Sequence, residues 1–180
     1  MQRKQPMLDP TPPPTPLYTP EQRWRRDHTV WTLIQGILAP LQFLVFLVSL
    51  VLVCRTLVWG VDADWALWSV VLKTGVLYLI MITGSIWEKV VFGQFLFVPA
   101  FFWEDVVSMG VMALHTAYVL AWVTDGLEPT ALLWLALAAY TSYVVNAAQF
   151  VWKLRAARLQ QTGRDNDDLA PSPSRYGRAS

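Results

Sequence analysis

Four long apolar runs dominate the chain and predict its architecture. They cover Val30 to Cys54, Ala66 to Trp87, Trp103 to Val123 and Thr130 to Trp152. A helix needs about 20 residues to cross about 30 Å of hydrocarbon, and each run is long enough. The pattern therefore predicts an all-α, polytopic membrane protein whose four transmembrane helices pack as a bundle.

Tryptophans locate the ends of the last three helices independently, because indole rings prefer the interface between membrane and water. The bracketing pairs are Trp68/Trp87, Trp103/Trp122 and Trp134/Trp152. Their members lie 19, 19 and 18 residues apart. At 1.5 Å per residue these separations are about 28 Å, which is one hydrocarbon thickness.

The two ends of the chain differ in composition from the apolar runs. Residues 1–20 carry seven prolines, and residues 160–180 are polar and charged. Neither stretch can bury enough apolar surface to fold, so both are predicted to be disordered tails around a membrane domain at 21–159. Arginines and lysines flank that domain at both ends, which predicts that both termini are cytoplasmic. Arg55 and Lys73 fall on the opposite side in this interpretation.

The connection between the second and third helices is unusual for a loop. Val90 to Phe102 is 13 residues long, too short to span, yet strongly apolar. It is predicted to lie in the membrane interface, which its aromatic side chains favour. They are Phe92, Phe95, Phe97, Phe101 and Phe102.

Overall composition narrows the function classes. The chain is 54% hydrophobic and 15% charged, which points away from a soluble globule. Its net charge of +1 gives no strong field for nucleic acid. The single cysteine, Cys54, excludes an internal disulfide and a cysteine-based metal site.

Each predicted helix carries one polar stripe at helical spacing. The stripes are Gln35, Gln42 and Ser49; Thr74, Tyr78, Ser85 and Glu88; Glu104, Ser108, His115 and Tyr118; and Ser142, Asn146, Gln149 and Lys153. Turning all four inward keeps polar groups away from lipid. This packing predicts a cavity open to the cytoplasmic leaflet, with Glu88 and Glu104 at its mouth, that narrows toward Gln42 and His115. Asp105 is displaced around the helix from the face of Glu104.

The same residues also have purely structural explanations. Amides and hydroxyls in membrane helices often only hydrogen-bond neighbouring helices. Glu104 and Asp105 suit a helix N-terminus through its dipole. Lys89 and Lys153 suit snorkelling toward the interface.

Common catalytic motifs do not account for this pattern. The chain has no P-loop, dinucleotide fingerprint, nucleophile elbow or HExxH, and no Glu-x-x-His repeats for a di-iron site. One deeply placed histidine supports a haem only weakly. Carboxylates and a histidine beside an aromatic pocket instead favour acid–base catalysis on an amphiphilic substrate.

Several strings resemble one known family. YTPEQRWRRD, GSIWEKVVFGQFLFVPAFFWED and YVVNAAQFVWKLRAARLQ are similar to the 3-vinyl (or 2-vinyl) bacteriochlorophyllide hydratases, over about Tyr18 to Gln160. The resemblance implies a lyase that adds water to the ring A vinyl group of a magnesium chlorin, giving a 1-hydroxyethyl group in bacteriochlorophyll synthesis. It implies a multi-pass protein of the bacterial inner (intracytoplasmic) membrane. No catalytic residue is carried over from the family.

The resemblance also sets the expected partners. They are the chlorophyllide or bacteriochlorophyllide substrate and the lipid bilayer, with other enzymes of the pathway as candidates and no nucleic acid. No resident cofactor is expected, since the substrate carries its own magnesium.

The reaction suggests roles for the polar residues. Burial near lipid disfavours a charged carboxylate, which suits an acid. Our hypothesis has Glu104 as the acid and Glu88 or His115 activating water, with His115 as axial ligand to the substrate magnesium as a competing role. The expected substrate-binding residues are Lys89 or Lys153 for the propionate, with Asp105, Gln42, Tyr118, Asn146, Gln149, Phe101 and Phe102. A non-catalytic pigment-binding or assembly protein and a small ion conductor remain alternatives.

Overall fold

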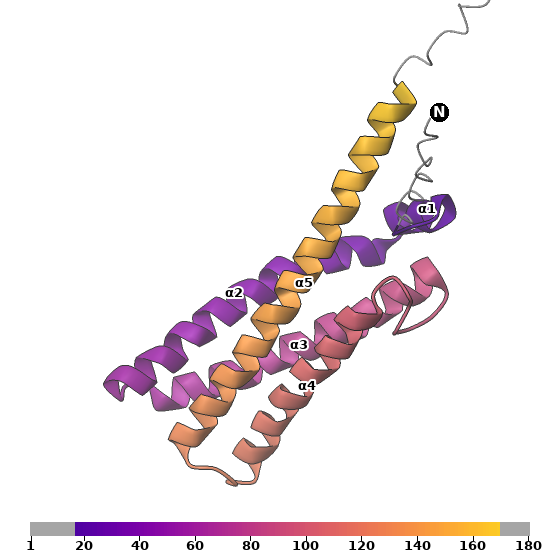
Figure 1. The fold of residues 1–180 in the computed structure, drawn as a ribbon. Coiled ribbons are helices and arrows are strands. Elements are labelled where there is room, and N and C mark those ends of the chain that lie inside the picture. The colour runs from indigo at the N-terminus through magenta and orange to yellow at the C-terminus, as the bar shows by residue number, and fades with distance from the viewer. Residues whose placement is uncertain (1–16, 170–180) are drawn as a thin grey trace, which may run out of the picture.

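The computed structural model describes residues 17–169, and every regular element in that part of the chain is an α-helix. The helices are α1 (Pro20–His28), α2 (Val30–Trp59), α3 (Ala63–Phe92), α4 (Phe102–Val123) and α5 (Pro129–Leu169) (Figure 1). All but α1 are long and apolar enough to cross a membrane. The predicted all-α fold with four membrane-spanning helices is therefore confirmed.

Helix ends lie further out than the apolar runs. α2 and α3 each have 30 residues, and both end at a glycine with positive φ, Gly60 (70°) and Gly93 (88°). Their amides donate to Thr56 and Lys89 carbonyls, which closes the last helical turn. Hydropathy marks only the lipid-crossing part of a helix, whereas glycine marks where the backbone stops.

The chain ends also depart from the predicted tails. α5 continues to Leu169 and projects well beyond the bundle in Figure 1, so residues 160–169 are helical where disorder was predicted. At the other end, Tyr18 is only 6% exposed although it lies within the predicted tail at 1–20. Residues 1–16 and 170–180, which make up the rest of both tails, lie outside the described residues.

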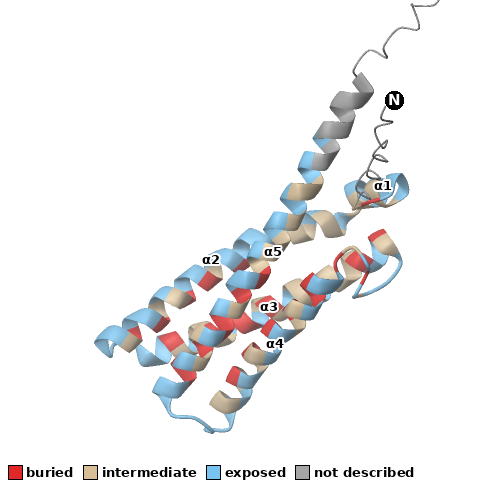
Figure 2. Ribbon diagram, in the orientation of Figure 1, coloured by how far each residue is buried: buried red, intermediate tan, exposed pale blue. Residues whose placement is uncertain are grey.

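The four long helices form two antiparallel hairpins, α2 with α3 and α4 with α5, which contact each other less extensively than their own members do. We call the surface between the hairpins the seam. Buried side chains gather there and exposed apolar ones cover the outside (Figure 2). In the seam Phe46 of α2 packs on Tyr140 and Tyr143 of α5, with ring centroids 5.4 and 5.0 Å apart. An apolar exterior around a partly polar interior suits a bundle surrounded by lipid.

A short amphipathic helix, α1, closes one end of the bundle, here called the α1 end. No helix is predicted before Val30 from hydropathy, so α1 is an addition. Thr19 caps it, with reciprocal hydrogen bonds between Thr19 and Gln22. Tyr18 anchors it by stacking on Phe92 (5.6 Å) and lying against Phe101 (6.5 Å). Burial raises the pKa of the Tyr18 phenol.

Replacing Tyr18 by alanine should release α1 from the bundle. Losing a buried aromatic ring costs about 3 kcal/mol, which increases the population of the undocked helix about a hundredfold. Trypsin cleavage at the α1 arginines should therefore accelerate in Tyr18→Ala. The matched control is Trp24→Ala, since Trp24 is 61% exposed. Equal cleavage rates in the two variants would contradict the anchoring role of Tyr18.

Candidate functional site

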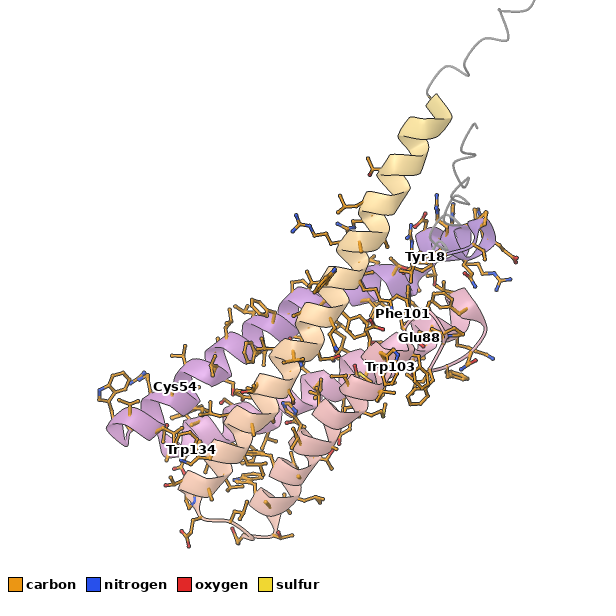
Figure 3. All side chains as sticks on the ribbon, viewed as in Figure 1. Tyr18, Cys54, Glu88, Phe101, Trp103 and Trp134 are labelled. Carbon is orange, nitrogen blue, oxygen red and sulfur yellow. The ribbon has the colours of Figure 1, made fainter. Side chains whose placement is uncertain are left out.

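Two carboxyl groups meet in the seam near the α1 end. Glu88 of α3 and Asp105 of α4 are 5% and 3% exposed, and their carboxyl groups lie close to each other (Glu88 is labelled in Figure 3). Two buried carboxylates repel each other and have no donor between them, so their proximity favours a proton on one of them. Neither residue takes part in an ion pair among the described residues. We call these two residues the carboxyl pair.

A backbone amide of the connecting segment holds one member of the carboxyl pair. The Phe97 amide donates to Asp105 Oδ2 at 2.7 Å. Phe97 has a φ of 57°, a left-handed conformation that is costly for a bulky residue and persists where its surroundings enforce it. The 93–101 segment is therefore more than an interfacial anchor. It turns the Phe97 amide inward while Phe95 and Phe97 stay 55% and 39% exposed.

The neighbouring acid, Glu104, points toward a different helix. Consecutive residues of a helix are about 100° apart, and α4 contacts both α3 and α5, so Asp105 faces α3 while Glu104 faces α5. Glu104 Oε2 accepts from Lys153 Nζ at 2.6 Å in an ion pair. Lys153 Nζ also lies 5.1 Å from the Phe101 ring centroid. Asp105 is displaced around the helix from Glu104, as the spacing predicts, and it lies beside Glu88, so the two glutamates of the predicted site face different partners.

A second buried polar pair lies deeper in the seam. Lys73 of α3 and His115 of α4 are both 0% exposed, and Lys73 Nζ is 2.5 Å from His115 Nε2. His115 Nδ1 lies 2.8 Å from the Val111 carbonyl, so Nδ1 is the donor to that carbonyl and Nε2 accepts from Lys73. With both ring nitrogens engaged, His115 cannot ligate a substrate magnesium unless Lys73 moves away.

Lys73 is a buried residue that the sequence interpretation does not include in the site. The sequence interpretation places it on the side opposite the termini, and the structure shows it fully buried, with Nζ 4.1 Å from the Tyr143 ring centroid. A signal was present, because Lys73 lies five residues inside Trp68 within the predicted span. An ionisable residue inside a membrane helix is itself a functional hypothesis.

Polar amides connect the two pairs along the seam. Asn146 Nδ2 donates to Ser108 Oγ at 2.8 Å, which ties α5 to α4. Gln42 is 1% exposed, and neither its Oε1 nor its Nε2 has a hydrogen-bond partner among the described residues. Gln149 Oε1 and Glu88 Oε2 also have no hydrogen-bond partner among the described residues. Buried polar groups normally bind protein, water or ligand, so these atoms are available for a guest.

The remaining predicted residues divide between the seam and the outer surface. Tyr118 is 0% exposed and donates to the Leu67 carbonyl at 3.2 Å, and Phe101 is 2% exposed. Phe102 is 42% exposed. Lys89 is exposed and its Nζ donates to the Gly93 carbonyl at 2.8 Å, which places it at the end of α3 and outside the seam.

The cavity predicted at the α1 end stays a prediction. A shallow hollow on the surface of α5 is lined by Ala148, Val151, Trp152, Arg155, Ala156 and Leu159. It contains neither buried pair. Within residues 17–169, no group of three histidine, cysteine or acidic side chains is arranged to hold a metal ion.

Comparison with known proteins decides the family. A sequence model of the 2-vinyl bacteriochlorophyllide hydratases matches residues 18–156. The chain belongs to this family. A 2-vinyl bacteriochlorophyllide hydratase of Rhodobacter capsulatus is 61% identical over 153 residues, 85% of this chain and 89% of the relative. One from Cereibacter sphaeroides is 61% identical over 156 residues, 84% of this chain and 96% of the relative. No solved structure matches the chain.

The hydratase family match covers the whole candidate site. It begins at Tyr18, the residue that anchors α1, and extends past Lys153 of the Glu104 ion pair. Both the carboxyl pair and the Lys73–His115 pair lie inside it. The resemblance inferred from the sequence strings is thereby confirmed.

Substitutions of Asp105 should show how much the hydrogen bond from the Phe97 amide contributes to stability, separately from the proton-transfer role of the carboxyl group. Asparagine can accept from that amide and donate to Glu88, whereas leucine leaves the amide without a partner at a cost of about 1–3 kcal/mol. We expect Asp105→Leu to be destabilised by that amount relative to Asp105→Asn. Denaturant unfolding in detergent micelles measures the difference. Equal stability of the two variants would contradict the proposed contact.

Proposed function

We propose that this chain adds water to the vinyl group of a bacteriochlorophyllide and converts it to a 1-hydroxyethyl group. Membership of the 2-vinyl bacteriochlorophyllide hydratase family supports the reaction and the substrate class. The observation that carries the mechanism is the buried carboxyl pair formed by Glu88 and Asp105.

Hydration of a vinyl group needs two proton transfers. A proton adds to the terminal carbon, and the positive charge left on the adjacent carbon is delocalised by the macrocycle. Water then bonds to that adjacent carbon and loses a proton to a base. An acid and a base placed side by side therefore serve the two neighbouring carbons of one double bond.

The carboxyl pair matches this requirement. One member, holding the shared proton, gives it to the terminal carbon, and the other member, as carboxylate, takes a proton from the attacking water. After the reaction the pair again holds one proton, on the opposite member, so it is ready for another turnover. Each such transfer is typically worth about a hundred- to ten-thousandfold in rate.

The other predicted catalytic residues receive different roles. Glu104 is engaged by Lys153 in an ion pair, so we assign the acid role to the carboxyl pair in place of Glu104. His115 lies 11 residues from Glu104 in α4, about 16 Å deeper, which is too far to act on the same double bond. Phe101, buried between the carboxyl pair and α5, supplies an aromatic surface for the macrocycle.

We further propose an orientation in the bacterial inner membrane with the α1 end in the cytoplasm. Basic residues gather at that end, whereas acidic ones gather at the opposite end. The basic residues are Arg23, Arg25, Arg26, Lys153, Arg155 and Arg158, and the acidic ones are Asp62, Asp64, Asp125 and Glu128. Acid–base hydration requires no resident cofactor, and other enzymes of the pathway are proposed partners for transfer of the product.

The direct test supplies membranes containing the chain with a 3-vinyl bacteriochlorophyllide in isotopically labelled water. We expect a product heavier by one water and carrying the labelled oxygen. Pigment binding with no change in pigment mass would contradict the enzyme proposal and leave a pigment-binding protein.

Matched variants test the assignment of the proton-transfer groups. Glu88→Gln and Asp105→Asn should each lower kcat by about a hundred- to ten-thousandfold. Glu104→Gln should lower it by less than about tenfold, because a partly exposed ion pair contributes little. The opposite order, with Glu104→Gln inactive and Glu88→Gln active, would return the acid role to Glu104.

A further inference from the structure

The mechanism leaves one buried cationic side chain unused. Lys73 is 0% exposed, and its polar contact is His115, a neutral acceptor in this arrangement. The ion pairs among the described residues are Arg25–Glu21, Arg26–Asp27, Arg55–Asp62 and Lys153–Glu104. Lys73 belongs to none of them. A lysine buried without an acid is costly, and in a membrane helix it points to function.

We propose that Lys73 binds the propionate carboxylate of the substrate. This inference rests on the proposed function, since it takes the vinyl group to lie at the carboxyl pair. The vinyl group is on ring A and the propionate is on the neighbouring ring D, and the two groups extend from the macrocycle in different directions. A pigment held at Glu88 by its vinyl group can therefore extend its propionate away from the α1 end, along the seam toward Lys73.

The spacing of the two sites fits this placement. Glu88 and Lys73 are 15 residues apart in α3, which is about 22 Å between their Cα atoms. Both side chains contact α4, Glu88 through Asp105 and Lys73 through His115, so both lie on the side of α3 that faces the seam. The length of a chlorin from vinyl to propionate, extended by two protein side chains, spans such a separation.

Lys73 also has the donors that a carboxylate needs. An ammonium group has three N–H donors, and His115 Nε2 accepts only one. The Tyr143 ring face, 4.1 Å from Nζ, supports the positive charge from one side. A bound carboxylate would complete the ion pair that Lys73 lacks and would itself be neutralised inside the membrane.

The two lysines predicted to meet the propionate are less available. Lys153 Nζ is engaged by Glu104 at 2.6 Å, and Lys89 Nζ donates to the Gly93 carbonyl outside the seam. Gln42 and Asn146, whose oxygens lack partners, lie between the α1 end and the Lys73 level and offer polar contacts to the rest of the pigment.

The test compares a 3-vinyl bacteriochlorophyllide with its propionate methyl ester. For the native chain, dissociation constants from pigment absorbance and KM from turnover should favour the free acid by about ten- to a hundredfold. Lys73→Met should reduce this preference to about onefold. Lys73→Gln, which can still donate a hydrogen bond to His115, should also reduce the preference to about onefold. It replaces the methionine variant if that variant does not fold. Arg55→Met is the matched control, because Arg55 is exposed and paired with Asp62, and it should keep the preference.

Three results would overturn the proposal. They are a native chain that binds acid and ester equally, folded Lys73 variants that keep the native preference, and loss of the preference in Lys153→Met but not in Lys73→Met. The binding measurement needs no turnover. A chain that prefers the acid through Lys73 but makes no hydrated product would therefore contradict the hydratase mechanism and support the propionate site.

Discussion

The carboxyl groups of Glu88 and Asp105 lie next to each other, buried from solvent and outside the ion pairs of the described residues. Such an arrangement is tolerable only if the groups share a proton and receive hydrogen bonds. The α1 end of the protein provides for this. The 93–101 segment turns the Phe97 amide toward Asp105 of the carboxyl pair, at the cost of a left-handed backbone at Phe97. α1 then covers the aromatic cluster beneath that segment through Tyr18. The geometry of the pair thus depends on elements on both sides of it.

The seam between the hairpins concentrates the polar chemistry of the chain. Besides the carboxyl pair, Lys73 meets His115 there, Tyr78 meets Thr116, and Ser49 meets Tyr140. Lipid cannot satisfy any of these groups, so each one favours keeping the hairpins together. An amphiphilic macrocycle arriving from the bilayer finds polar partners in this seam, where buried residues gather (Figure 2), whereas many of the exposed residues of the helices are large and apolar. The polar side chains of the seam therefore both stabilise the bundle and offer contacts to the substrate.

Much of the fold follows from the sequence, because length and hydropathy identify the four membrane helices and tryptophan spacing locates the ends of the last three. The site follows less completely. Glu88, Asp105 and His115 are recognisable as buried ionisable groups, but which groups pair depends on α4 contacting both α3 and α5, and no local pattern encodes that. The α1 helix was missed although Thr19, Pro20 and Gln22 form a recognisable helix start. Lys73 is not among the predicted site residues, because the sequence interpretation considers it only as a charge on the side opposite the termini.

The central claim is that Glu88 and Asp105 hold one proton between them. Infrared difference spectroscopy of the protein in detergent or membranes measures it most directly, since a protonated carboxyl has its own carbonyl band, which shifts in heavy water. The account predicts such a band in the native chain, its persistence in Glu104→Gln, and its loss when Glu88→Gln and Asp105→Asn are combined. A band that survives the double variant, or one that disappears with Glu104→Gln, would contradict the shared proton.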